Sequence, residues 1–104
     1  MRTGAETPVF VRYAAGVWSD DERTEFISWI ANHPDAGDVI PGSGGCQKVR
    51  WSRRGQGKRG GARVIYFCGA DEVIWLLIVY AKSKLDKLPT TFLAQLKEGI
   101  EDAI

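Results

Sequence analysis

The hydrophobic positions in the first half of the chain predict a short strand and then a helix. Residues 9–11, Val-Phe-Val, follow a proline and are typical of a strand. Ser19 and Glu22 have the spacing of a capping box, in which each side chain accepts from a backbone N–H of the other residue. The apolar residues after them recur at helical spacing until a proline ends the run. Residues 35–45 hold a further proline and four glycines and predict a loop, with a short helical turn at residues 36–39 as the alternative.

The second half of the chain alternates with a period of two and predicts three strands. They cover residues 46–52, 62–68 and 73–82. The third is almost wholly apolar, so we expect it to be central and buried on both faces. The short turn at residues 69–72 predicts that the last two strands form an antiparallel hairpin.

The end of the chain and the order of the elements predict the fold class. Apolar residues recur every three or four positions between residues 92 and 104, which predicts a final amphipathic helix beginning at Thr90 or Thr91. A run of strands set apart from helices is typical of the α+β class with a small antiparallel sheet of about four strands. The length of 104 residues suits one hydrophobic core, so residues 1–104 are expected to form a single domain.

The composition is that of an ordinary globular protein, with 44% hydrophobic and 11% aromatic residues, which argues against disorder. The longest apolar stretch, residues 73–81, is far shorter than the roughly 20 residues that a membrane-spanning helix needs. No signal peptide is visible, so we expect a cytoplasmic protein with no membrane partner. Cys46 and Cys68 lack metal-ligand spacing and are expected to be free thiols, and the sequence predicts no metal and no cofactor.

Half of the positive charge lies in one segment without acidic residues. Residues 39–70 contain no Asp or Glu but seven of the fourteen basic residues, although the formal net charge of the whole chain is only +1. Charge segregated in this way indicates one basic surface that faces a polyanion. The seven residues are Lys48, Arg50, Arg53, Arg54, Lys58, Arg59 and Arg63.

The simplest alternative for this basic cluster is a solvated hairpin loop. Against it, Lys48, Arg50 and Arg63 fall on predicted strands, where like charges lower stability unless an anion binds. We therefore expect the cluster to bind a phosphate backbone, and Trp51, beside the basic loop, to stack on a base. Residues 55–60 match G-x-G-x-x-G, but they join two predicted strands rather than a strand and a helix, so a dinucleotide site is not expected.

Three segments have a more specific pattern. Residues 37–50 read Gly-Asp-Val-Ile-Pro-Gly-Ser-Gly-Gly-Cys-Gln-Lys-Val-Arg. Residues 57–67 read Gly-Lys-Arg-Gly-Gly-Ala-Arg-Val-Ile-Tyr-Phe, and residues 76–82 read Leu-Leu-Ile-Val-Tyr-Ala-Lys, followed by Leu-Asp-Lys-Leu at residues 85–88. In this order they resemble the RelE/HigB-type toxins of bacterial type II toxin–antitoxin pairs, in the RelE/ParE superfamily. The resemblance covers nearly the whole chain and implies a RelE-like antiparallel sheet with helices packed on one face.

The resemblance also implies an activity, that of a ribosome-dependent mRNA endonuclease (an mRNA interferase) that inhibits translation. Arg63 matches the strand arginine that the family uses on the scissile phosphate. Lys48 and Arg50 match two basic positions of the preceding strand. Lys82 matches the basic position after the last long strand, where the following Ser-Lys pair departs from the commoner Asn-Glu.

Cleavage through the 2′-hydroxyl of the RNA requires neither histidine nor a metal. A lysine crowded by other cations can accept the proton, and guanidinium groups supply permanent donors to the phosphorane oxygens. The general acid stays open between Tyr66, Tyr80 and Lys82. The remaining basic and aromatic residues are expected to hold RNA rather than to perform chemistry: Trp51, Arg53, Arg54, Lys58, Arg59 and Lys84.

The expected partners are the ribosome, its mRNA and a cognate antitoxin of the helix-turn-helix type, because an uninhibited nuclease would arrest its own host. Two alternatives remain. A ParE-like toxin has the same fold but inhibits gyrase, and the cations at Lys48, Arg50 and Arg63 argue against it. An RNA-binding or ribosome-binding module without catalysis is separated only poorly by the sequence.

Overall fold

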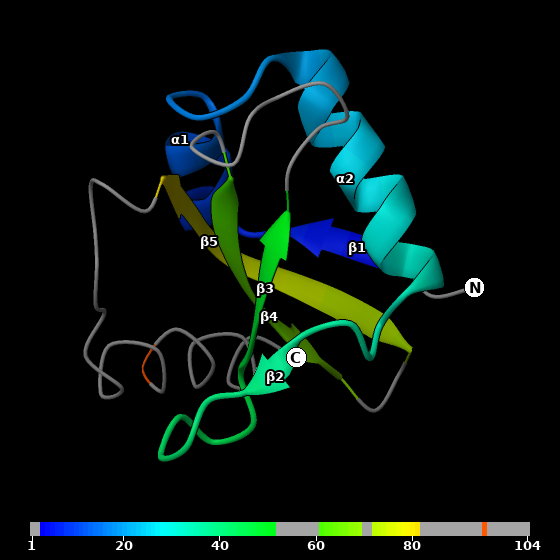
Figure 1. Ribbon diagram of the computed structural model, residues 1–104, viewed down its shortest axis with the longest axis vertical. Coiled ribbons are helices and arrows are strands. Elements are labelled where there is room, and N and C mark those ends of the chain that lie inside the picture. The colour runs from blue at the N-terminus through cyan, green and yellow to red at the C-terminus, as the bar shows by residue number, and fades with distance from the viewer. Residues whose placement is uncertain (1–2, 52–60, 70–71, 82–94, 96–104) are drawn as a thin grey trace.

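The computed structural model describes residues 3–51, 61–69, 72–81 and 95, in which five strands form one mixed sheet and two helices pack against it (Figure 1). This confirms the predicted α+β class, although the sheet has one strand more than expected. The strand order is β1-β5-β4-β3-β2. The elements are β1 (Thr3–Glu6), α1 (Pro8–Ala14), α2 (Asp20–Asn32), β2 (Asp38–Val39), β3 (Gln47–Trp51), β4 (Ala62–Cys68) and β5 (Val73–Ala81).

The strand at the N-terminal edge makes the sheet mixed rather than antiparallel. β1 runs parallel to β5, with Thr3 opposite Val73 and Glu6 opposite Leu76, whereas the other three pairs of strands are antiparallel. The prediction of a purely antiparallel sheet is therefore wrong at this edge. The sequence of β1, Thr-Gly-Ala-Glu, has no apolar alternation, because an edge strand needs few buried side chains.

Residues 9–11 lie in the helix α1, so the short strand predicted there is wrong. Thr7 caps this helix, since its Oγ1 accepts from the backbone N–H of Phe10 at 3.1 Å. Pro8 occupies the first helical turn, where its missing N–H leaves no bond unmade. Phe10 and Ala14, four residues apart, are both buried. Capping and burial on one face thus outweigh the β-branched side chains of this short run.

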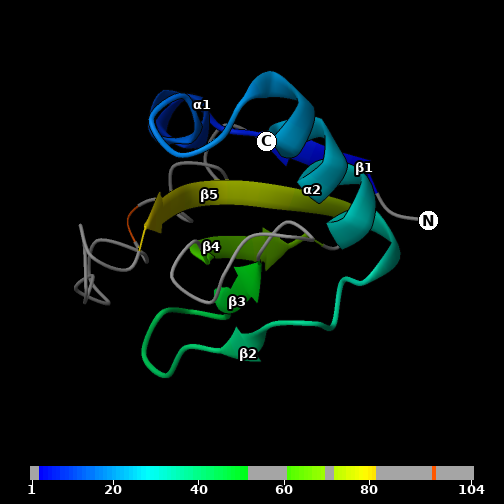
Figure 2. The same ribbon diagram turned by 45° about the horizontal axis from the view of Figure 1, so that its top comes forward.

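The capping box predicted at Ser19 is confirmed and begins α2. The Ser19 Oγ accepts from the Glu22 backbone N–H at 3.3 Å, and the Glu22 Oε1 accepts from the Ser19 N–H at the same distance. The helix ends before Pro34, with His33 as its C-terminal cap and the His33 ring stacked on Trp29 at a centroid distance of 4.8 Å. Both helices lie on the same side of the sheet (Figure 2).

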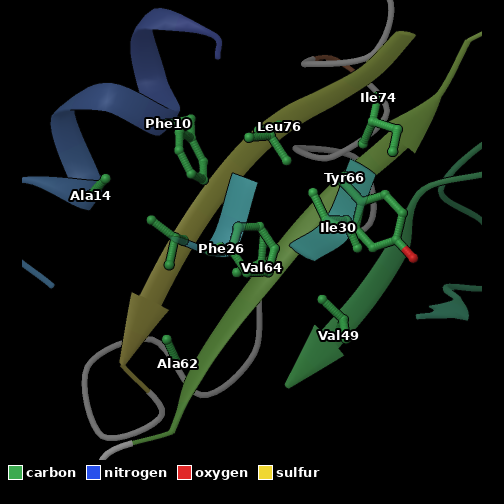
Figure 3. Packing of buried hydrophobic residues seen from close by; sticks show 11 residues of the cluster. Phe10, Ala14, Phe26, Ile30, Val49, Ala62, Val64, Tyr66, Ile74 and Leu76 are labelled. Carbon is green, nitrogen blue, oxygen red and sulfur yellow. The ribbon is translucent and has the colours of Figure 1, made fainter. Parts of the chain in front are cut away.

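The side of the sheet that faces the helices, called here the helix face, carries the larger hydrophobic cluster (Figure 3). Phe10 and Ala14 of α1 and Phe26 and Ile30 of α2 pack there against alternate residues of the strands. All of these side chains are at most 7% exposed. The strand residues of this cluster are Val49, Ala62, Val64, Tyr66, Ile74, Leu76 and Val79.

The antiparallel hairpin predicted for β4 and β5 is confirmed, and its register shifts once. Ile65 lies opposite Ile78 but Tyr66 lies opposite Leu76, so Leu77 is an extra residue in β5. Such bulges are common beside functional sites because they redirect side chains. Thr7 is tied to this point, since its hydroxyl donates to the carbonyl of Leu76 at 2.8 Å.

The segment predicted as a loop at residues 35–45 contains the two-residue strand β2 and no helical turn. The following turn is organised around Ser43, which is fully buried. Its hydroxyl donates to the carbonyl of Ile40 at 2.6 Å and accepts from the N–H of Cys46 at 3.1 Å. The helix predicted from Thr90 or Thr91 lies outside the described residues. No helix in the described part of the chain is long and apolar enough to cross a membrane.

Candidate functional site on the basic face of the sheet

Basic side chains of β3 and β4 gather on the side of the sheet opposite to the helix face. In β3, Val49 belongs to the helix-face cluster and Trp51 packs against it, so Lys48 and Arg50 point the other way, as the alternation predicted. Arg63 of β4 lies directly opposite Arg50. We call this side the basic face, and it is defined by Lys48, Arg50 and Arg63.

One row of residues crosses three strands on the basic face. Arg50 is paired with Arg63, and Arg63 is in turn paired with Tyr80 of β5. Residues directly opposite each other in an antiparallel sheet have Cβ atoms about 4.5–5.5 Å apart. The two guanidinium groups can therefore reach the same phosphate, with the tyrosine beside them.

Among the described residues, no ion pair joins an acidic side chain to any of the three cations. Lys48 and Arg50 are exposed and Arg63 is half-buried. The ion pairs found among the described residues join Arg23 of α2 to Glu6 and to Asp20. Like charges directly opposite on a sheet are destabilising. A bound polyanion would remove this repulsion between Arg50 and Arg63, which makes the face a suitable phosphate site.

An apolar floor lies next to the cations. Ile65 lies opposite Lys48, and Ile78 lies opposite Ile65. Both isoleucines are buried in one hydrophobic cluster, which also contains Cys46 and Tyr80. Packed side chains of this kind hold the strand backbones in fixed positions. The cations of β3 and β4 are thus mounted on rigid strands, as a site that must place charges accurately requires.

Tyr66 does not join this group of residues. It lies on the helix face, fully buried, where its hydroxyl donates to the carbonyl of Pro34 at 2.9 Å and accepts from the N–H of Gly37 at 2.8 Å. Burial raises the pKa of Tyr66 above its ordinary value. The position on the opposite face from Arg63 argues against Tyr66 as the general acid and leaves Tyr80 as the tyrosine next to the arginines.

Trp51 also lies on the helix face. Its ring meets those of Trp18 and Phe26 edge to face, with centroid distances of 5.5 Å and 5.4 Å. Such aromatic contacts stabilise the core. This placement argues against the prediction that Trp51 stacks on an RNA base.

An acidic residue that the sequence argument missed lies at the edge of the basic face. Asp38 of β2 is directly opposite Lys48 of β3. It precedes the acid-free segment of residues 39–70 by one position. Nothing in the sequence indicated Asp38 as a site residue, because only the pairing of β2 with β3 brings it next to Lys48.

Several predicted site residues lie outside the described part of the chain. These are the expected RNA-binding residues Arg53, Arg54, Lys58, Arg59 and Lys84, and the catalytic candidate Lys82. Their assignment stays a prediction. Among the residues that the structure describes, no group of three His, Cys, Asp or Glu side chains could hold a metal ion, and neither cysteine is in a disulfide.

No protein-family model matches the chain. Among solved structures, it is similar to the E. coli toxin RelE, determined in the free state as an arginine double mutant. The TM-score is 0.61, and the match covers 92% of this chain and 96% of that chain at 13% sequence identity. The chain has the fold of RelE. The fold implied by the sequence resemblance is thereby confirmed, whereas an identity this low leaves the functional residues of the RelE fold to be argued from the site itself.

Proposed function

We propose that this protein is the toxin of a type II toxin–antitoxin pair and cuts mRNA on the ribosome. The observation that carries the proposal is the row of Arg50 and Arg63 on the basic face, next to Lys48 and with no ion pair to any of the three among the described residues. The RelE fold supports it, because the RelE structure is that of a toxin.

The basic face suits phosphate-ester cleavage through the 2′-hydroxyl of the RNA. The guanidinium groups of Arg50 and Arg63 would bind the non-bridging oxygens and stabilise the charge that grows on the phosphorane. Tyr80, paired with Arg63 and 5% exposed, is the candidate donor to the leaving 5′-oxygen. The ribosome would supply the alignment of the message for in-line attack, which accounts for a large part of such rate enhancements.

The proposed function includes a neutralising partner. An acidic segment of a small helix-turn-helix antitoxin would meet a complementary surface on the basic face, and charge complementarity speeds association. The helix face offers a poorer docking surface, since Phe26 and Ile30 are fully buried against the sheet.

Cell-free translation of a defined message followed by primer extension tests the proposal. The parent chain is expected to give codon-phased cuts that depend on translation, and Arg63→Ala to lower the cleavage rate about 100-fold or more, the usual effect of removing one donor to a transition-state oxyanion. Arg12→Ala is the matched control, because Arg12 is an exposed arginine of α1, remote from the basic face.

The outcomes separate the candidate functions. Intact message with inhibited DNA supercoiling would assign the chain to the gyrase-inhibiting toxins, and ribosome binding without cleavage would leave a binding module. An Arg63→Ala variant with the parent's circular dichroism melt and the parent's cleavage rate would exclude the basic face as the active site.

A further inference from the structure

The proposed reaction needs a proton acceptor on the basic face, and Lys48 is the one candidate that the cations themselves offer. The 2′-hydroxyl must lose a proton as its oxygen attacks phosphorus, and an arginine cannot accept one under physiological conditions. The groups at the site carry N–H or O–H bonds and act as hydrogen-bond donors: Lys48, Arg50, Arg63 and Tyr80. A carboxylate is the simplest acceptor at neutral pH.

The register of the sheet supplies one carboxylate at this place. The described strands carry two acidic residues, Glu6 and Asp38. Glu6 is bound to Arg23 at 3.3 Å, away from the basic face. Asp38 is exposed and lies directly opposite Lys48, so the two side chains are on the same face, and Arg50 is its diagonal neighbour at about 7–8 Å between backbones.

The backbone on both sides of Asp38 is held in place. On one side, the N–H of Gly37 donates to the Tyr66 hydroxyl at 2.8 Å. A Cβ atom at Gly37 would lie 2.7 Å from that hydroxyl and 2.9 Å from the carbonyl of Lys48, so only glycine allows this close approach of β2 to β3. On the other side, the Ile40 N–H donates to the carbonyl of Cys46 at 2.8 Å. A residue fixed in this way can act as a positioned base.

We propose that Asp38 is the general base of the ribonuclease reaction, an assignment that rests on the proposed function. The 2′-oxygen gives its proton to a carboxylate oxygen of Asp38 and forms a bond to phosphorus. The bond from phosphorus to the 5′-oxygen breaks with its electron pair, and this oxygen takes a proton from water or from Tyr80. The products are a 2′,3′-cyclic phosphate and a free 5′-hydroxyl.

The arrangement of the strands suits in-line attack. Asp38 lies on β2 and Tyr80 on β5, and the arginines of β3 and β4 lie between them. A phosphate bound by Arg50 and Arg63 would thus have the base on one side and the phenol on the other.

Single-turnover cleavage of ribosome-bound mRNA between pH 6 and pH 8 tests the assignment. Catalysis by a carboxylate base predicts a parent rate that does not rise with pH across this range. Asp38→Asn is expected to lower the rate at pH 7 about 100-fold or more. Its residual rate should rise about tenfold per pH unit, because hydroxide must then remove the proton.

The controls separate a base from a structural residue. Asp35→Asn removes the same charge from an exposed position three residues earlier and is expected to leave the rate within about twofold of the parent. Asp38→Glu retains a carboxylate and should keep the rate within about tenfold. Ribosome concentrations for half-maximal cleavage should stay within about threefold in all variants, because the base acts after binding.

Each result decides one of the two proposals. A parent chain that is folded and does not cut mRNA contradicts the proposed function itself. If the parent cuts and Asp38→Asn keeps the parent's rate, or is slow but independent of pH, the assignment of Asp38 is wrong and the proposed function stands. A parent rate that rises tenfold per pH unit would assign the base to an amine such as Lys48 instead. Should Asp38→Asn misfold, Asp38→Ala with added formate replaces it, and a rate that formate does not restore contradicts the assignment.

Discussion

The helix face and the basic face belong to the same three central strands, yet the charged side chains of these strands all lie on the basic face. On the helix face, Val49, Val64 and Val79 form a buried apolar row between the helices and the sheet. On the basic face, the next row holds Arg50 and Arg63, with no ion pair to either among the described residues. Strand alternation thus separates the buried core from the proposed site by a single position along the chain.

The two tyrosines of the central hairpin illustrate the same separation. Tyr66 and Tyr80 are the same residue type and were equal candidates for the general acid. Tyr66 lies on the helix face and holds the connection between α2 and β2 through Pro34 and Gly37. Tyr80 is paired with Arg63 on the basic face. Tyr66 therefore belongs to the core of the helix face, whereas Tyr80 lies where the proposed site needs a proton donor.

The strongest test of this comparison removes a large side chain from the helix face. Phe26 is fully buried and contacts the rings of Trp18 and Trp51. Phe26→Ala is expected to lower the free energy of unfolding by about 3–5 kcal/mol, measured by urea denaturation, because it leaves a cavity in the core. Cleavage per folded molecule should change little, since no atom of Phe26 lies on the basic face.

Thr24→Ala is the control for this experiment, because Thr24 is an exposed residue of the same helix. Its unfolding free energy is expected to stay within about 0.5 kcal/mol of the parent. If Phe26→Ala remained as stable as the parent but lost cleavage, the separation of the two faces would be refuted.

A smaller effect is expected from the hydroxyl of Tyr66. Tyr66→Phe removes the bond to the Pro34 carbonyl and leaves the N–H of Gly37 without its acceptor. A buried polar group without a partner lowers stability by about 1–3 kcal/mol, which urea denaturation can measure. Tyr13→Phe is the matched control, because Tyr13 is 39% exposed on α1. Equal stabilities of the two variants would show that the Tyr66 hydroxyl does not hold the connection to β2.

The sequence correctly predicted the elements that can be recognised from a local pattern of side chains. The alternation in β3, β4 and β5 and the capping box at Ser19 are local patterns, and the structure confirms both. The basic face also followed from alternation, since Lys48 and Arg50 differ from Val49 by one position. Periodicity alone was enough to place these charges.

The parts that the sequence could not predict depend on contacts between distant residues. The helix at residues 9–11 had a local signal in Thr7 and Pro8, which the strand prediction overlooked, but the burial of Phe10 against the sheet depends on distant residues. β1 exists because it pairs with β5, and Thr7 bonds to Leu76, 69 residues away. Asp38 reaches the site only through its register with Lys48. Composition and periodicity carry no information on such pairings.

The smallest expected effect is a dependence of stability on pH at the helix face. Burial raises the pKa of Tyr66 above its ordinary value of 10.0, so the folded protein holds this phenolic proton more tightly than the unfolded chain does. The stability from the neutral phenol is fully present below about pH 10 and is lost as the pH rises from there through the pKa of the folded state.

Urea denaturation of the parent and of Tyr66→Phe between pH 8 and pH 11, at constant ionic strength, measures this loss of stability. The difference in unfolding free energy between the two proteins should be constant up to about pH 10 and then shrink, because only the parent has a phenol to ionise at this site. A difference that stays constant to pH 11 would mean that the phenol ionises with the same pKa in both states, and Tyr66 would not be enclosed by the helix face as the fold requires.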